Sequence, residues 1–295
     1  MIAPSPRIRC LTVVACLLAA RLLPAAEPAP LPPIVELSAF PAKLELNGIR
    51  DSRRVLVTGK TADGALIDLT ISARFSVAGE AVALEADGYV TPRKEGTAQL
   101  LVQAAGRDLT VPVEVKNAQP TPVSFVREIQ PSMSKVGCNQ GTCHGAQEGK
   151  NGFKLTLRGY DPELDYFALV DDLSGRRFNR SLPSQSLMLL KPTQGVPHVG
   201  GFLFDEDSRH YKLIHAWIAE GCQFDNQTRV TKLDVFPSSP VIDLEGRKLQ
   251  QIVIAHFADG TSRDVTRDAV FSSSNFNVAT VTNSTESSGV VESLR

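Results

Sequence analysis

The stretch ADGTSRDVTRDAVFSSSNFNVATV, residues 258–281, decides the fold because it repeats an earlier part of the chain. Residues 62–83 read ADGALIDLTISARFSVAGEAVA. The two stretches share an Ala-Asp-Gly turn, an Asp and a Thr behind it, then Phe-Ser and Val-Ala, all at one constant spacing. Phe40-Pro41 recurs at the same spacing as Phe236-Pro237. A match that keeps every interval indicates a duplicated structural unit, so we predict one copy at residues 33–117 and a second at residues 230–295.

Each copy has the pattern of an all-β domain. Short runs rich in branched residues, such as 54–58 and 100–103, alternate with turn signals that include Asp63-Gly64 and Asp87-Gly88. Glycine accepts the positive φ that a tight hairpin turn requires. The second copy stops before the equivalents of the last strands of the first, so we expect it to be incomplete at its C-terminus.

Several motifs of the second copy carry a family resemblance. They are Asp259-Gly260-Thr261, Asp264-Val265-Thr266, Phe271, Ser272-Ser273 and Val278-Ala279-Thr280-Val281. In this order they resemble the group 2 bacterial immunoglobulin-like domain. The resemblance implies a β-sandwich that exported and surface proteins use as a spacer or adhesive module. It also implies contact with a cell surface or a polysaccharide as a role for these domains.

Residues 121–225, between the copies, differ in character. Asp161-Pro162 is a capping residue followed by proline and predicts the start of a helix. Ser208 predicts the start of another, with an apolar face that includes Ile214 and Ile218 and an end at Gly221. This pattern predicts a small, loop-rich helical domain.

The insert carries the sequence Cys138-Asn-Gln-Gly-Thr-Cys143-His144. Cysteines followed directly by histidine are typical of covalent haem attachment, although the usual motif places two residues between the cysteines and this one places four. A disulfide between Cys138 and Cys143 is a second interpretation, and a zinc site that includes His144 is a third. The spacing alone leaves the three interpretations open.

Further motifs carry a second resemblance. They are Phe125-Val-Arg-Glu-Ile-Gln-Pro131, the cysteine motif itself, Gly152-Phe-Lys-Leu-Thr-Leu-Arg-Gly-Tyr-Asp161, Gly175-Arg-Arg177, Leu189-Leu-Lys-Pro192, Val196-Pro-His198 and Trp217-Ile-Ala-Glu-Gly221. In this order they resemble the cytochrome c-like domain of large exported planctomycete-type proteins, which immunoglobulin-like modules often flank. The resemblance implies haem c bound through Cys138 and Cys143. The expected fold class is therefore multidomain α and β, with two immunoglobulin-like β-sandwiches, the second truncated, flanking a small mostly α cytochrome c-like domain.

With haem bound, His144 is the expected proximal iron ligand because it follows Cys143 directly. For the distal ligand we favour His198, which a preceding proline would hold in a stiff loop, with Met188 as the alternative. His210 and His215 are expected to be packing or surface residues. Arg177 is expected to pair with a haem propionate, and Arg176 and Lys191 are weaker candidates for the same role.

The first 26 residues predict an export signal, since Arg7 and Arg9 precede an apolar run that ends in small residues at Ala25-Ala26. A lipid anchor at Cys16 is the alternative. The run is too short for a membrane span, so we expect a location in the periplasm or at the cell surface. The chain has 31 basic and 32 acidic residues, which gives no electrostatic basis for binding nucleic acid.

The expected function is that of an exported electron-transfer module with a redox partner protein. We expect no catalytic activity of its own, because the chain lacks a Gly-x-Ser-x-Gly motif, a phosphate-binding loop and a His-Glu-x-x-His helix. The alternative is a haem-free structural or adhesion protein with a Cys138–Cys143 disulfide.

Overall fold

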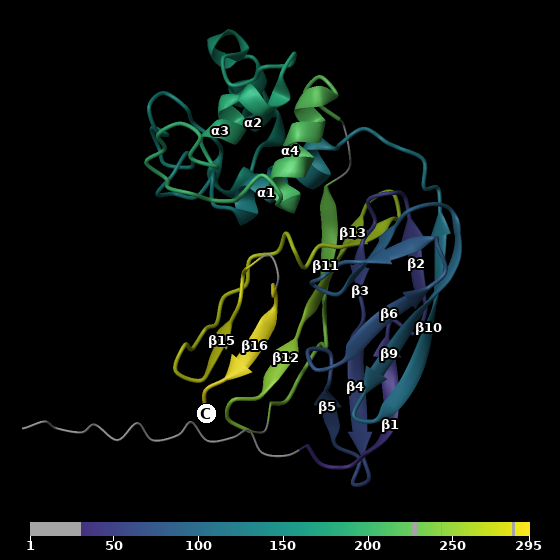
Figure 1. The fold of residues 1–295 in the computed structure, drawn as a ribbon. Coiled ribbons are helices and arrows are strands. Elements are labelled where there is room, and N and C mark those ends of the chain that lie inside the picture. Colours follow the sequence, from purple (N-terminus) through teal and green to yellow (C-terminus); the bar gives the residue numbers. More distant parts are fainter. Residues whose placement is uncertain (1–30, 226–228, 243, 285–286) are drawn as a thin grey trace, which may run out of the picture. The chain divides into compact units, whose positions relative to one another are not determined.

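The computed structural model describes residues 31–225, 229–242, 244–284 and 287–295. The expected export signal at residues 1–26 lies outside these ranges. The chain divides into two units, Met1–Leu31 and Pro32–Arg295, and the second unit holds all the helices and strands shown in Figure 1.

Copy one forms three β-sheets, and all of its strand pairs are antiparallel except β2 with β10, which are parallel. Their strand orders are β1-β4-β5, β2-β10-β9-β6 and β3-β8-β7. The strands are β1 (Ile34–Phe40), β2 (Leu44–Asn47), β3 (Arg53–Arg54), β4 (Leu56–Thr61), β5 (Leu66–Asp68), β6 (Arg74–Ala78), β7 (Val82–Leu84), β8 (Tyr89–Pro92), β9 (Gly96–Ala104) and β10 (Arg107–Lys116). Strands β9 and β10 alternate exposed and buried residues, so one face of this hairpin closes the core. That core joins Leu44, Val57, Leu69, Leu100 and Val113 in one apolar cluster.

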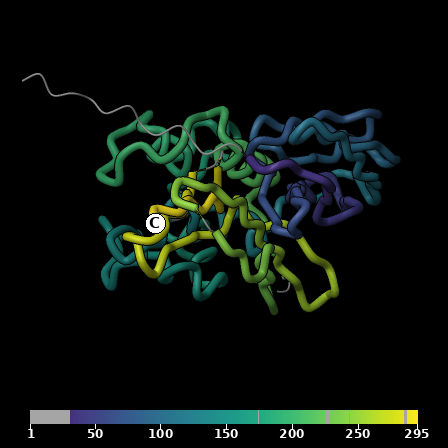
Figure 2. The backbone as a smooth tube through the Cα atoms, turned by 90° about the horizontal axis from the view of Figure 1, so that it is seen from below, coloured from purple at the N-terminus to yellow at the C-terminus, as the bar shows by residue number. Residues whose placement is uncertain are grey.

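Copy two repeats part of this arrangement. Its strands are β11 (Val230–Phe236), β12 (Lys248–Gln250), β13 (Ile252–Phe257), β14 (Ser262–Asp264), β15 (Ala279–Val281) and β16 (Val290–Ser293). Sheet β11-β13-β14 has the strand order and register of β1-β4-β5, and sheet β12-β16-β15 has the order of β3-β8-β7. Within the described residues of copy two, nothing corresponds to the four-stranded sheet of copy one. In Figures 1 and 2 the two copies are followed by colour, purple to blue for the first and green to yellow for the second.

The two copies contact each other through equivalent residues. Arg54 and Gln250, which are 196 residues apart, join through their side chains. The Arg54 amide donates to Asp264 at 3.0 Å, and the equivalent Gln250 amide donates to Asp68. The rings of Phe40 and Phe236 lie 4.3 Å apart. Because each contact has its counterpart with the copies exchanged, the copies meet as an isologous pair does in a two-fold dimer.

The insert holds short helices and single helical turns. They are η1 (Phe125–Ile129), α1 (Gln130–Lys135), η2 (Leu157–Gly159), α2 (Pro162–Val170), η3 (Asp172–Gly175), η4 (Pro183–Gln185), α3 (Leu187–Leu190) and α4 (Arg209–Ala219). As predicted, Asp161 caps α2 and Ser208 caps α4. The helices surround the buried indole of Trp217, which packs on the rings of Phe125 and Phe178. None of the helices in the described ranges is long and apolar enough to cross a membrane.

The expected fold class is wrong in its helical part. Strands make up 31% of the structure and helices 17%, and the strands form several small sheets. The protein is therefore mostly β and has no substantial α domain of the cytochrome type. The longest helix of the insert, α4, has 11 residues, and α3 has four. Frequent glycines with positive φ between the helices, among them Gly137, Gly152 and Gly175, explain the difference, because such backbone cannot continue a helix. Apolar spacing identified the faces of the helices, but it overestimated how much of the insert is helical.

Arg267 provides a test of the contact between the copies. Its buried guanidinium pairs with Asp87 at 2.6 Å and stacks over the Tyr89 ring at 3.7 Å. We expect Arg267→Ala to lower the free energy of unfolding by roughly 1–3 kcal/mol, because it leaves the half-buried Asp87 carboxylate without its partner. Urea denaturation measures this change. The control Lys94→Ala removes only an exposed pair with Glu80 and should leave the denaturation midpoint unchanged; equal effects of the two variants would contradict a structural role of the contact.

Candidate functional site

The two cysteines of the insert lie on one compact loop that follows α1. The Cys138 amide donates to the Met133 carbonyl at 2.9 Å, which ties the loop to the end of the helix. The His144 amide donates to the Cys138 carbonyl at 3.0 Å. This bond returns the chain to Cys138 after the four intervening residues, so the widened spacing forms a turn and His144 lies next to both cysteines.

Two glycines allow this loop to close. A Cβ atom on Gly145 would lie 2.1 Å from the Asn139 carbonyl oxygen, and one on Gly149 would lie 2.3 Å from the Phe153 carbonyl oxygen. Both distances are far inside van der Waals contact, so only glycine permits the backbone to approach this closely. The loop conformation therefore depends on residues outside the cysteine motif.

His144 is oriented through one of its two ring nitrogens. Its Nδ1 lies 3.0 Å from the Phe153 carbonyl oxygen, and because a carbonyl only accepts, Nδ1 carries the proton. The Nε2 atom then has its lone pair available, and it has no hydrogen-bond partner in the described part of the chain. Burial lowers the pKa of His144, the hydrogen bond to the Phe153 carbonyl opposes this effect, and the nearby positive charges of Arg177 and Lys191 add to the lowering, which favours the neutral imidazole.

His198 has the same arrangement. Its Nδ1 lies 3.0 Å from the Gly201 carbonyl oxygen, so Nδ1 donates to that oxygen and Nε2 is the other ring nitrogen. A Cβ on Gly200 would lie 2.7 Å from the His198 ring, so the absence of a side chain there makes room for the imidazole. His198 and His144 are 54 positions apart in sequence, and the fold brings them close enough to interact electrostatically.

Phe153 links the remaining groups of the site. The Arg177 guanidinium lies over its ring at 4.2 Å, and the His144 ring lies 4.5 Å from it on centroids. Arg177 is buried, and Asp172 accepts from it through its carbonyl oxygen at 3.1 Å. Sequence reasoning gave Phe153 no role, although its place directly after Gly152 within a run of apolar and basic residues was visible.

Cys138 and Cys143 are separate thiols in the structure, as is Cys222. Burial raises the pKa of the Cys138 thiol to about 12, and the neighbouring Cys143 contributes to the same shift. The thiol is therefore neutral at physiological pH and is a poor nucleophile. The described residues contain no cluster of three or more His, Cys, Asp or Glu side chains placed to hold a metal ion.

The other candidate ligands lie in the packing of the insert. Met188 belongs to the apolar core around Trp217. His210 is buried and its Nδ1 lies 2.7 Å from the Ser132 hydroxyl. His215 stacks on Tyr211 with ring centroids 6.0 Å apart. Of the three histidines considered as distal ligands, His198 is the one whose charge acts on the pKa of His144.

The donor set fits a covalently attached haem. Two thiols and an adjacent imidazole meet on one loop, and a second imidazole with its Nδ1 satisfied lies nearby. A backbone carbonyl on Nδ1 is the usual outer partner of a metal-bound histidine, since it fixes the ring and presents Nε2 to the metal. Arg177 supplies a buried positive charge of the kind that a carboxylate would need.

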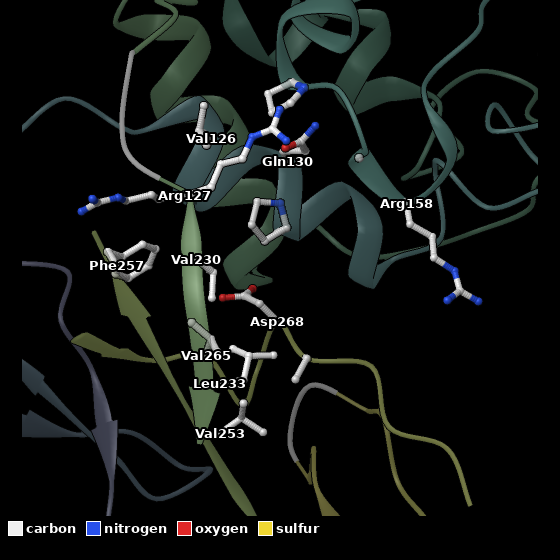
Figure 3. A pocket seen from close by; sticks show the side chains of 15 residues that line it. Val126, Arg127, Gln130, Arg158, Val230, Leu233, Val253, Phe257, Val265 and Asp268 are labelled. Carbon is white, nitrogen blue, oxygen red and sulfur yellow. The ribbon is translucent and has the colours of Figure 1, made fainter. Parts of the chain in front are cut away.

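A hollow of about 430 Å³ lies elsewhere, between the start of the insert and the sheet β11-β13-β14. Figure 3 shows Val126, Arg127 and Gln130 on one side of it and Val230, Leu233, Val253 and Val265 on the strand side. Arg127 stacks over Phe257 at 4.1 Å and pairs with Asp259 at 2.6 Å. None of the residues of the cysteine loop lines this hollow.

Comparison with known proteins adds no assignment. No protein-family model matches the chain, and no curated protein matches it.

Gly145 provides a test of the loop geometry. We expect Gly145→Ala to destabilise the insert by roughly 1–3 kcal/mol, because the added methyl group overlaps the Asn139 carbonyl. The control is Gly141→Ala, whose Cβ would meet only Leu157, at 3.8 Å. Thermal unfolding followed by the near-ultraviolet circular dichroism of Trp217 compares the two. A Gly145→Ala protein as stable as the Gly141→Ala protein would show that the loop closes differently.

The lowered pKa of His210 predicts that the folded protein loses stability in acid. Burial lowers its pKa from 6.5 to about 4, and the nearby charge of Arg209 adds to the shift. The unfolded chain then binds a proton that the folded chain does not, so stability is complete above about pH 6.5 and is lost as the pH falls toward about 4. The loss from this group is about 3 kcal/mol.

Denaturation midpoints measured between pH 4 and pH 7 test this expectation. His210→Gln should reduce the slope of stability against pH, because it removes the group whose pKa is lowered by folding. His144 also has a lowered pKa and contributes to the slope that remains. An unchanged slope in His210→Gln would contradict the assignment.

Proposed function

We propose that this protein is an exported haem-binding electron-transfer protein, with the haem attached to Cys138 and Cys143. The observation that carries the proposal is the matched orientation of His144 and His198, each with Nδ1 bonded to a backbone carbonyl at 3.0 Å and Nε2 left as a ligand atom. A structural role for the two histidines would not require both rings to hold Nδ1 in the same way and leave the same nitrogen over.

Each residue of the proposed site would have its own role. Cys138 and Cys143 would hold the porphyrin through thioether bonds, and His144 and His198 would be the iron ligands. Arg177, kept in place by Phe153 and Asp172, would meet a propionate. When bound, the haem supplies one-electron redox chemistry, and ligation by two histidines favours electron transfer over oxygen chemistry.

The predicted leader at residues 1–26 supports export as part of the proposal. The near balance of 31 basic and 32 acidic residues supports a protein partner over nucleic acid. The proposal concerns a haem site on a loop-rich insert within a mostly β protein, and it requires no large helical domain.

Expression of the full chain with haem-attachment machinery tests the proposal. We expect a Soret band that remains with the polypeptide after denaturation, because thioether bonds survive unfolding. His144→Ala should abolish the native low-spin spectrum, and His198→Ala should open the iron to carbon monoxide. His256→Ala is the matched control, since this residue lies on β13 and contacts Asp234.

Three outcomes would count against the proposal. One is a colourless protein whose mass is two hydrogens below that of the reduced chain, which would assign the cysteines to a disulfide and favour a haem-free structural role. Another is a haem that separates from the chain on denaturation. A wild-type spectrum in His144→Ala would reject that residue as a ligand.

A further inference from the structure

The lysines of the insert differ from those of the two copies in how their charge is balanced. Every lysine of the copies pairs with an acidic side chain, and these lysines are Lys43, Lys60, Lys94, Lys116, Lys232 and Lys248. Among the described residues, no lysine of the insert has an acidic partner, and these lysines are Lys135, Lys150, Lys154, Lys191 and Lys212. The insert therefore carries positive charge that acidic neighbours in the described chain do not neutralise.

Two of these lysines lie on the hairpin that orients His144. Lys154 directly follows Phe153, whose carbonyl oxygen lies 3.0 Å from Nδ1 of His144. The Lys150 amide donates to the same carbonyl at 2.9 Å. Both lysine side chains are exposed. The backbone that fixes His144 thus places two ammonium groups at the surface beside it.

Two further basic residues lie on the segments of Arg177 and His198. Arg176 is exposed and directly precedes the buried Arg177. Lys191 is exposed, and its Nζ donates at 3.1 Å to the carbonyl of Pro197, the residue before His198. The four exposed basic residues therefore lie on the three stretches of backbone that carry the candidate site.

Acidic side chains are few on these stretches. Residues 144–160 contain Glu148 as their one acid, and residues 175–204 contain none, against seven basic residues in the two ranges together. Asp172, just before the second range, pairs with Arg177 at 3.4 Å. The whole chain has 31 basic and 32 acidic residues, so the excess is local. A local excess of one sign attracts and orients a partner of the opposite sign.

Two apolar side chains are exposed on the same stretch as His198. Val199 directly follows His198 and is fully exposed, and Phe202 is 59% exposed. Neither side chain has a hydrogen-bond donor or acceptor to offer to a sugar or to an inorganic anion. An apolar contact with a charged rim is the anatomy of a protein–protein interface, so these residues favour a protein as the occupant.

We propose that the redox partner of this chain docks on a basic surface of the insert and presents an acidic rim around an apolar contact. The basic members of the surface are Lys150, Lys154, Arg176 and Lys191. Val199 and Phe202 supply the apolar contact. The proposal rests on the proposed electron-transfer function, because the surface borders the candidate haem site and orients the partner toward it.

A fluorescently labelled peptide of glutamates with two central leucines serves as the probe, added to the haem-loaded full chain at low ionic strength. We expect saturable binding by fluorescence anisotropy that weakens as salt is added, because the charges are exposed. The double variant Lys150→Glu, Lys154→Glu should bind about tenfold more weakly. The matched control is Lys212→Glu, which changes an unpaired lysine on α4, outside the three stretches, and should bind as the wild type does.

Two comparisons separate charge from apolar contact. A peptide with glutamine in place of glutamate should bind at least tenfold more weakly than the acidic peptide, because it offers no charge to the surface. Phe202→Ser should weaken binding of the leucine-containing peptide several-fold and should leave binding of an all-glutamate peptide unchanged, because the latter has no apolar side chain to place there.

Electron transfer to hexacyanoferrate(III) shows whether the surface acts at the haem. This trianion takes one electron from the reduced haem, and stopped-flow absorbance measures the rate. We expect the double variant to react about threefold more slowly than the wild type, because reversed charges repel the anion. Lys212→Glu should react at the wild-type rate.

Three results would overturn the proposal. They are equal binding by the double variant and the wild type, equal affinity for the glutamate and glutamine peptides, and tighter binding of polygalacturonate than of the acidic peptide. The last would assign the surface to an acidic polysaccharide. A chain that takes up no haem would overturn the proposed function and this proposal together, whereas a haem-loaded chain that does not bind the acidic peptide would overturn this proposal alone.

Discussion

The Glu128 carboxylate joins all three parts of the folded chain. It is 4% exposed, and its Oε1 accepts from Arg50 of copy one at 2.9 Å and lies 3.4 Å from Arg263 of copy two. Its Oε2 accepts from the Ser124 amide at the first turn of the insert. A buried carboxylate is tolerated only where such partners compensate for its lost hydration, so the copies and the insert must adopt this arrangement together.

The same arrangement gives the two copies unequal environments. Their mutual contacts are reciprocal, as shown by Asp68 and Asp264, each of which accepts an amide from the opposite copy. Burial raises the pKa of both carboxyl groups, and the hydrogen bonds that they accept oppose this effect. On the side away from this contact, copy one closes its core with a four-stranded sheet, whereas in the described part of copy two residues of η1 lie against sheet β11-β13-β14. Duplication thus accounts for the pairing of the copies, and the insert accounts for part of what differs between them.

The insert shows where local pattern stops being informative. Capping by Asp161 and Ser208 was readable because a cap depends on residues three or four positions apart. The amount of helix was not readable, because glycines such as Gly137 and Gly175 interrupt the backbone at positions that apolar spacing does not reveal. Phe153 was missed for a related reason. Its role comes from a guanidinium on one side and an imidazole on the other, and both arrive from other parts of the chain.

The amino-acid sequence by itself determined the duplication, the turns between the strands and the adjacency of Cys143 and His144, because each of these is a matter of intervals along the chain. Only the tertiary structure decided that Arg177 and His144 pack against the same Phe153 ring. Such contacts join residues far apart in sequence, and packing and hydrogen bonding select them from many pairings that the same composition allows.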